Sequence, residues 1–218
     1  MDRNNNVSTP KKDSPDKALL GSSTIVYIIM LSVGAMIAYY CHGTLGKYLL
    51  IESPSLLGKY LCVALLGSGV LIVLNLLFEE YFASYKSLKE ALVELLGPYS
   101  ILMLIYLSFI SAFGEEVLFR GAIQPYLGLF VTSLIFGLIH IGPGNRISSW
   151  SLWALLAGLL LGWMYKQLGN LWPSIMCHFT VNMVSMTRIK IAYRKTMALK
   201  ETSSQSITDN ASSKGRGL

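Results

Sequence analysis

Charged residues are scarce in this chain. Aspartate, glutamate, lysine and arginine make up 14% of its 218 residues, whereas a typical soluble domain contains about 25%. Hydrophobic residues make up 53%, and they are gathered in long blocks instead of being spread at amphipathic spacing. A soluble all-α protein, the alternative interpretation, would have to bury its helices completely. The composition therefore predicts an all-α polytopic membrane protein that folds as one transmembrane helix bundle.

The sequence also lacks the motifs of several common kinds of site. The three cysteines are scattered among apolar segments, without the spacing of a zinc site or a disulfide framework. None of the three histidines belongs to an HExxH zinc-protease motif, and the GxSG and GxGD motifs of other membrane proteases are missing. The net charge of +6 comes without a basic recognition module, so we expect no nucleic-acid partner. No internal repeat supports a transporter built from inverted repeats.

The hydrophobic blocks predict about six membrane-spanning segments. A helix of about 20 apolar residues crosses the ~30 Å apolar core of a bilayer. The predicted spans are 23–41, 56–78, 99–126, 128–141, 150–167 and 171–191. The third and fourth form one apolar stretch that Pro125 and Gly128 interrupt, so we expect a tight helical hairpin there.

The segments outside these spans set the predicted domain boundaries and orientation. Residues 1–22 and 192–218 are polar and are predicted to be disordered cytoplasmic tails, the second of them basic. Residues 23–98 hold two spans followed by an amphipathic segment that suits a helix in the membrane interface. Residues 99–191 hold the other four spans and form a predicted membrane domain of their own. Fourteen lysines and arginines fall on the side of the N-terminus and four on the other, so we expect both termini in the cytoplasm.

A few strongly polar side chains interrupt the third, fourth and sixth predicted spans. Together with Phe136 they form three pairs with a spacing of four residues, which places both members of a pair on one helix face: Glu116 and Arg120, Phe136 and His140, His178 and Asn182. At a helical rise of ~1.5 Å per residue, Glu115, His140 and Asn182 each lie about 14–17 Å from the outer ends of their helices. We therefore expect a shared polar cavity within the bundle, near the middle of the membrane.

Each polar residue also has a purely structural interpretation. Glu116 and Arg120 make most simply an ion pair that stabilises the bundle, and a membrane histidine is often an ordinary interhelical hydrogen-bond partner. Glu115 has no partner on its own helix, because adjacent side chains diverge. A carboxylate in such a cavity can act as a general base on water, and histidine or asparagine can stabilise an oxyanion. Together these groups suit hydrolysis of a peptide bond by activated water.

The three motifs resemble those of the CPBP family. They read Glu115-Glu116-x-x-x-Arg120, Phe136-x-x-x-His140 and His178-x-x-x-Asn182, and the resemblance covers residues 99–186. This family groups CAAX prenyl endopeptidases with bacteriocin-processing and abortive-infection (Abi) proteins. The resemblance implies an intramembrane glutamic endopeptidase in which Glu115 and His140 activate water and His178 and Asn182 form the oxyanion site. It further implies that Glu116, Arg120 and Phe136 support the site, and we predict no metal or other cofactor.

The resemblance also sets the expected partners. We expect a membrane-associated or lipidated protein or peptide as substrate, and the lipid bilayer of a bacterial cytoplasmic membrane as surroundings. The alternatives are a non-catalytic scaffold or bacteriocin-immunity factor of the same fold, and a small proton-coupled transporter. Oligomeric state stays open.

Overall fold

The described chain is a helix bundle. The structure, a computed structural model, describes residues 15–43, 46–51, 53–142 and 147–215, and these residues contain no β-strand. The elements are α1 (Pro15–His42), the 3₁₀ turn η1 (Gly46–Tyr48), α2 (Pro54–Tyr81), α3 (Ala83–Leu96), α4 (Ile101–Glu116), the π-helix η2 (Val117–Ile123), α5 (Gln124–Ile139), α6 (Ser149–Leu168) and α7 (Trp172–Gly215). The predicted all-α fold is confirmed.

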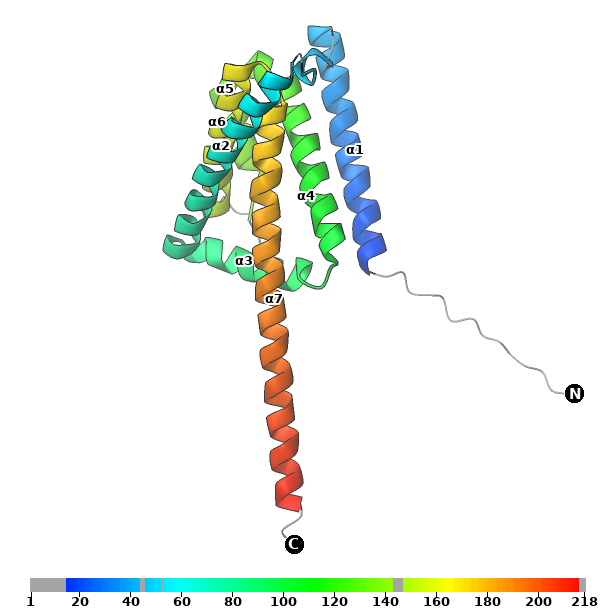
Figure 1. The fold of residues 1–218 in the computed structure, drawn as a ribbon, viewed down its shortest axis with the longest axis vertical. Helices are drawn as coiled ribbons and strands as arrows, with labels where there is room; N and C mark the ends of the chain where they lie inside the picture. The colour runs from blue at the N-terminus through cyan, green and yellow to red at the C-terminus, as the bar shows by residue number, and fades with distance from the viewer. Residues whose placement is uncertain (1–14, 44–45, 52, 143–146, 216–218) are drawn as a thin grey trace, which may run out of the picture.

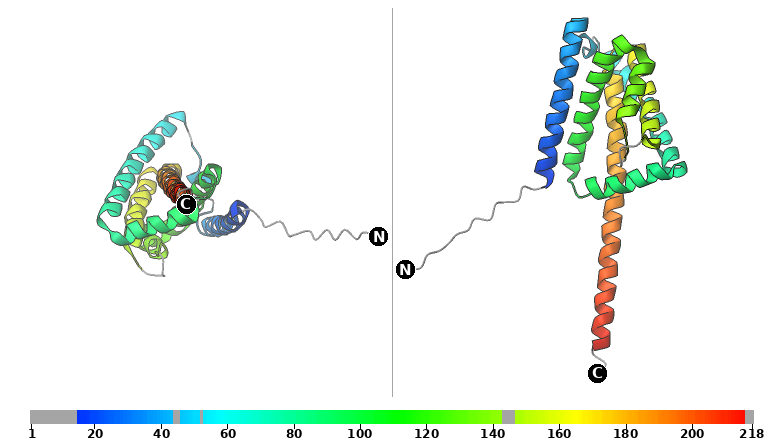
Figure 2. Two further views of the ribbon diagram at one scale, coloured as in Figure 1. Left: turned by 90° about the horizontal axis from the view of Figure 1, so that it is seen from below. Right: turned by 180° about the vertical axis from the view of Figure 1, so that it is seen from behind.

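Most helices run lengthwise through the molecule, and α7 lies among them. Helices α1, α2, α4, α5, α6 and α7 follow the long axis, while α3 lies across one end (Figure 1). Helix α7 packs against α2, α3, α4 and α6, and the view along the axis shows it end-on among the other helices (Figure 2, left). Helices α5 and α7, which carry the second and third motif pairs, therefore lie close to the first motif at the end of α4.

Three helical stretches are long and apolar enough to cross a membrane. They are Ala18–Tyr40, Pro54–Tyr81 and Ile101–Ile139. Large apolar side chains such as Leu66 and Phe130 stand exposed on their outer faces, as expected where lipid replaces water. The last two predicted spans are also helical, as α6 and the first part of α7. Both are less apolar, because α6 carries Lys166 and Gln167 in its last turn and this part of α7 carries His178, Asn182, Arg188 and Lys190. The protein is an integral membrane protein.

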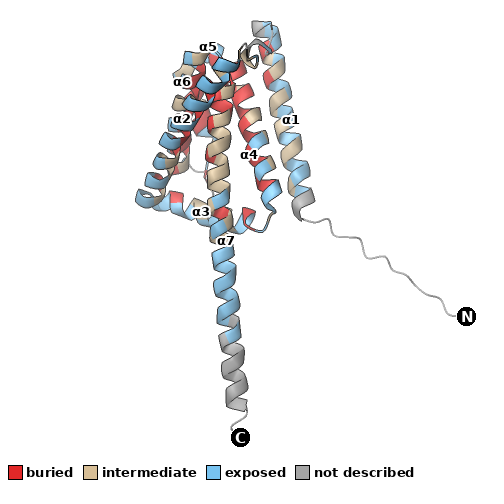
Figure 3. Cartoon of the chain, viewed as in Figure 1, coloured by how far each residue is buried: buried red, intermediate tan, exposed pale blue. Residues whose placement is uncertain are grey.

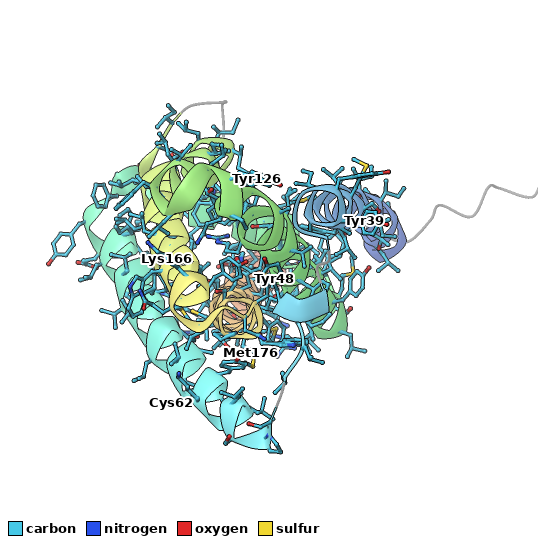
Figure 4. All side chains as sticks on the ribbon, turned by 90° about the horizontal axis from the view of Figure 1, so that it is seen from above. Tyr39, Tyr48, Cys62, Tyr126, Lys166 and Met176 are labelled. Carbon is cyan, nitrogen blue, oxygen red and sulfur yellow. The ribbon has the colours of Figure 1, made fainter. Side chains whose placement is uncertain are left out.

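The predicted hairpin between the third and fourth spans is present. The backbone from α4 through η2 into α5 stays helical except at Gly128, where φ is 74°. Glycine adopts this left-handed region without the steric cost that other residues meet. Beyond this point α5 returns along α6, its main packing partner. Figure 4 looks onto this end of the bundle, where Tyr126 is labelled, and it shows Tyr39 of α1 and Cys62 of α2 on opposite outer sides.

Helices extend further at both ends of the chain than the sequence predicts. Helix α1 begins at Pro15 and α7 continues to Gly215, inside the stretches 1–22 and 192–218 where we expected disorder. The outermost parts of these stretches, 1–14 and 216–218, lie outside the described residues. Between Ser174 and Lys214 the sequence has no glycine or proline to end a helix. Beyond α3 the described side chains of α7 are exposed (Figure 3), so local preference and not packing sustains this extension.

Helix α3 closes one end of the bundle. It takes the place of the predicted amphipathic interfacial helix, although the first residues of that segment, up to Tyr81, belong to α2. The Ser84 and Ser149 hydroxyls lie 2.7 Å apart and join α3 to α6. Just after α3, the backbone oxygens of Gly97 and Tyr99 accept hydrogen bonds from Lys190 Nζ of α7, at 2.7 and 2.6 Å. These polar contacts tie both ends of α3 to the lengthwise helices.

Candidate active site

The first motif lies where α4 turns into a π-helix. Glu115 and Glu116 end α4, and the following residues form the π-helix η2. Such wide turns are rare and often occur at functional sites. Helix α1 supports this turn from outside, because a Cβ added at Gly34 would lie only 3.1 Å from the Leu118 Cα atom. Nothing in the spacing of apolar residues predicted this change of helix type.

Glu116 holds two basic side chains from two helices. Its Oε1 atom accepts hydrogen bonds from Arg120 Nη1 and from His178 Nδ1, both at 2.9 Å. Arg120 also donates through Nη2 to the Gly158 oxygen at 3.2 Å, and its Cζ atom lies 4.5 Å from the centre of the Phe136 ring. The pairing of Glu116 with Arg120 agrees with the sequence prediction. The contact with His178 was not predicted, and it makes Glu116 a link between α4 and α7.

Glu115 faces two imidazole rings at nearly equal distance. Its Oε2 atom lies 3.8 Å from His140 Nε2 and 3.9 Å from His178 Nε2. That oxygen is buried and accepts no hydrogen bond from any described residue. The two separations exceed a direct hydrogen bond, and one water at about 2.8 Å from each atom would bridge them. Glu115 is thus the carboxylate of the site that can bind a water molecule or a substrate.

The partners of the two histidines decide which ring nitrogen carries hydrogen. His140 Nδ1 lies 2.7 Å from the Phe136 oxygen, and a carbonyl oxygen only accepts, so this nitrogen is protonated. His178 Nδ1 faces the Glu116 carboxylate and is a donor for the same reason. In each neutral ring Nε2 is then an acceptor, and it is the atom that faces Glu115. A proton can therefore move between Glu115 and either imidazole without a change of ring orientation.

Asn182 lies on α7 one turn beyond His178. Its Nδ2 atom donates to Ser111 Oγ at 3.0 Å, which uses one of the two hydrogens of the amide. The second hydrogen stays available for a ligand. Ser111 precedes Glu115 by four residues on α4, so the two share a helix face. The sequence prediction missed Ser111, although this spacing was a usable signal.

One cavity joins the predicted catalytic residues. It has a volume of about 290 Å³. Its lining includes all four of them, together with Phe136 and Ser111. Glu116 and Arg120 are not part of the lining and lie behind it, consistent with a supporting position. The structure thus brings together the residues that the three motifs singled out, from α4, α5 and α7.

The cavity continues to the end of the bundle that α3 closes. There Glu79 of α2 contacts Arg188 of α7, with Nη2 to Oε2 at 2.7 Å, and Lys89 of α3. Arg188 and Tyr85 both bond to Asn75, at 3.2 and 2.7 Å. Burial raises the pKa of the Tyr85 phenol above its usual range, and Glu79 adds to this effect, so the phenol stays neutral. We did not predict this group, because Glu79, Lys89 and Arg188 lie on three different helices and no short spacing in the sequence links them.

No metal centre is evident among the residues that the structure describes. They include no set of three histidine, cysteine, aspartate or glutamate side chains arranged to hold a metal ion. In particular, both Nδ1 atoms at the site are already hydrogen-bonded within the protein. The absence of a metal cofactor remains a prediction.

Comparison with known proteins identifies the segment that carries this site. Residues 97–184 match the family described as type II CAAX prenyl endopeptidase Rce1-like. This segment is therefore similar to the Rce1-like family. The match contains all three motifs and confirms the resemblance to the CPBP family. Helices α1 and α2, and α7 after residue 184, lie outside it.

The relatives in two bacteria are uncharacterised. The chain is 36% identical over 96 residues to the uncharacterized protein YpbD of Bacillus subtilis, covering 43% of this chain and 49% of the relative. It is 27% identical over 133 residues to the UPF0177 protein YxdF of Lactococcus lactis, covering 58% of this chain and 72% of the relative. The chain thus matches about half the length of the first relative. No solved structure matches it.

Proposed function

We propose that this protein is an intramembrane endopeptidase that hydrolyses a peptide bond with water activated by Glu115. The observation that carries the proposal is the Glu115 Oε2 atom, a buried acceptor without a hydrogen-bond donor among the described residues, 3.8 and 3.9 Å from two imidazole Nε2 atoms. A carboxylate with this surrounding can take a proton from water. The family match supports the reaction class. The location of the site in a membrane protein supports a membrane-associated or lipidated protein or peptide as substrate.

The proposed reaction uses each site residue once. Glu115, with His140 as relay, removes a proton from water, and the resulting hydroxide attacks the carbonyl carbon of the scissile bond. His178 enters this step as the imidazolium, so its Nε2 atom, together with Asn182 Nδ2, donates hydrogen bonds to the oxyanion that forms. The Glu116 carboxylate at Nδ1 stabilises the positive charge of His178 in this state. Collapse of the intermediate breaks the carbon–nitrogen bond, and the stored proton passes to the leaving amine.

The proposed location is a bacterial cytoplasmic membrane, with both termini in the cytoplasm. The start of α1, the whole of α3 and the extension of α7 lie at one end of the bundle (Figure 1). Most of the described lysine and arginine residues belong to segments at this end, which favours the cytoplasmic side. The cavity extends towards the same end. Substrate would therefore reach Glu115 from the cytoplasmic side.

The proposal can be tested without knowledge of the substrate. Cells that express the wild-type chain, Glu115→Gln or Glu80→Gln are compared for new protein N-termini in their membrane fractions. Glu80 is an exposed acid of α2 outside the cavity lining, so it controls for the loss of one carboxylate. We expect cleavage products with the wild type and Glu80→Gln but none with Glu115→Gln, which should instead retain uncut substrate. Identical products in all three strains would contradict the proposal and favour a scaffold or immunity function.

A further inference from the structure

Helix α1 lies outside the segment that matches the Rce1-like family, yet it contributes to the cavity. Its half-buried Tyr27 lines the same cavity as Glu115, Ser111 and Asn182. Tyr27 also borders a separate apolar pocket of about 100 Å³ between α1 and α4. The side chain therefore stands between this outer pocket and the candidate active site.

Ser111 has both Tyr27 and Asn182 as neighbours in the wall of the cavity. The Tyr27 phenol lies close enough to Ser111 and Glu115 to interact with both side chains. Ser111 Oγ accepts from Asn182 Nδ2 at 3.0 Å and donates to the Ser108 oxygen at 3.3 Å. A hydroxyl has one hydrogen and two lone pairs. Since its hydrogen goes to Ser108, the Ser111 oxygen accepts from Asn182 and has a second lone pair that the Tyr27 phenol can use.

This arrangement fixes the orientation of the Asn182 amide. If Ser111 can only accept, then the amide must turn its Nδ2 atom and not its oxygen towards α4. Removal of the Tyr27 hydroxyl would leave Ser111 with an unused lone pair. It would also weaken the hydrogen bond that Ser111 donates to Ser108, because linked hydrogen bonds strengthen one another. Ser111 could then rotate and donate to Asn182 Oδ1, and the amide could flip. Asn182 would then no longer present a hydrogen-bond donor at the position of the oxyanion.

The backbone of α4 is shaped to receive Tyr27. A Cβ added at Gly114 would lie 3.2 Å from the Tyr27 Cδ1 atom, so the ring rests against the residue next to Glu115. This distance is closer than ordinary van der Waals contact, and a larger residue would push α1 away. The close approach places the phenol at a defined height on α4, beside the catalytic carboxylate.

We propose that Tyr27, acting through Ser111, is a positioning residue that sets the orientation of the Asn182 amide in the site. The kinetic consequence of this inference rests on the proposed function, whereas its structural consequence does not. Tyr106 provides a matched control, because its hydroxyl lies 2.7 Å from Thr24 Oγ1 across the same α1–α4 contact and does not line the catalytic cavity. Tyr27→Phe and Tyr106→Phe each remove one hydroxyl and keep the ring.

The structural test is nuclear magnetic resonance of the full chain in bicelles with ¹⁵N-labelled asparagine. The side-chain amide signal of Asn182 is assigned by its loss in Asn182→Asp. We expect this signal to shift in Tyr27→Phe and in Ser111→Ala but not in Tyr106→Phe, while the signals of Asn75 and Asn170 stay in place. An unchanged Asn182 signal in Tyr27→Phe overturns the inference, and so does an equal shift in Tyr106→Phe.

The kinetic test uses the substrate that is identified by comparing new protein N-termini in the membrane fractions. Loss of one oxyanion donor costs about 10²–10³ in kcat, so a misaligned donor should lower kcat about tenfold while KM changes less than about twofold. In an Asn182→Ala background, Tyr27→Phe should have no further effect, because coupled residues are not additive. Equal losses in both backgrounds would contradict positioning through Asn182. If the wild type cleaves nothing, the proposed function fails, and the amide signal still decides the inference.

Discussion

Two ion clusters, one behind the candidate active site and one at the end of the cavity, have the same arrangement of charges but differ in burial. The inner cluster consists of Glu116 with Arg120 and His178, and the outer cluster consists of Glu79 with Lys89 and Arg188. In each, one carboxylate contacts two basic side chains, and the contacts join different helices. The side chains of the inner cluster are 0–11% exposed, whereas those of the outer cluster are 21–31% exposed.

The difference in burial gives the two clusters different roles. A buried charge that loses its partner cannot be solvated, so the inner cluster holds its groups in one arrangement. A partly exposed charge can turn to water and to mobile ions, so the outer cluster adds little to stability. We infer that the inner cluster keeps His178 oriented for Glu115, and that the outer cluster loosely joins α2, α3 and α7 at the end of the cavity.

The largest expected effect comes from breaking the inner cluster. Glu116→Gln removes the charge that compensates buried Arg120, and the loss of one partner of a buried pair costs about 3–5 kcal/mol. Unfolding of the purified protein in mixed micelles, titrated with dodecyl sulfate, measures this loss. Glu80→Gln serves as the control and should leave the unfolding midpoint in place. A loss below about 1 kcal/mol for Glu116→Gln would show that the two clusters do not differ as described.

A smaller effect should follow from disturbing the contact of Arg120 with α6. A Cβ at Gly158 would lie 3.3 Å from Ser133 atoms and 3.4 Å from Phe136 Cδ1, so Gly158→Ala forces α5 and α6 apart beside the inner cluster. Overpacking of this kind costs about 1–3 kcal/mol, measured by the same unfolding titration. Gly69→Ala in α2 is the matched control, since nothing lies within 4 Å of the added Cβ. Equal stability of the two variants would contradict the close packing of α5 on α6.

The smallest effect is expected at the outer cluster. Glu79→Gln should lower the free energy of unfolding by no more than about 1 kcal/mol, because its partners can be solvated. The difference from the wild type should also shrink between 0.1 and 1 M salt. A loss as large as that of Glu116→Gln, or one that salt does not change, would place the outer cluster in the same class as the inner one.

Much of the site could be predicted because its signals are local. The pairs Glu116 and Arg120, and His178 and Asn182, follow from a spacing of four residues on one helix. The hairpin follows from Pro125 and Gly128 in an otherwise apolar stretch. The similar depth of Glu115, His140 and Asn182 follows from helical rise alone. These inferences needed no knowledge of which helices touch.

The rest depends on which helix faces meet, and the sequence does not state this. The second role of Glu116 arises only because α7 brings His178 to it, and the contribution of Tyr27 requires α1 to lie against Gly114. The π-helix η2 has no composition that distinguishes it from an α-helix. The extension of α7 differs from the predicted disorder, because serine, threonine and asparagine disfavour a helix less than glycine or proline does.

The central claim is that Glu115 activates the water and Glu116 does not. The most direct measurement compares cleavage by purified wild type and Glu115→Gln, reconstituted in liposomes with the captured substrate, beside the unfolding midpoint of each protein. We predict that Glu115→Gln lowers kcat by about 10³ or more, since the general base is lost, with an unfolding midpoint at least equal to that of the wild type. A variant that folds equally well and cleaves within about tenfold of the wild-type rate would contradict the account.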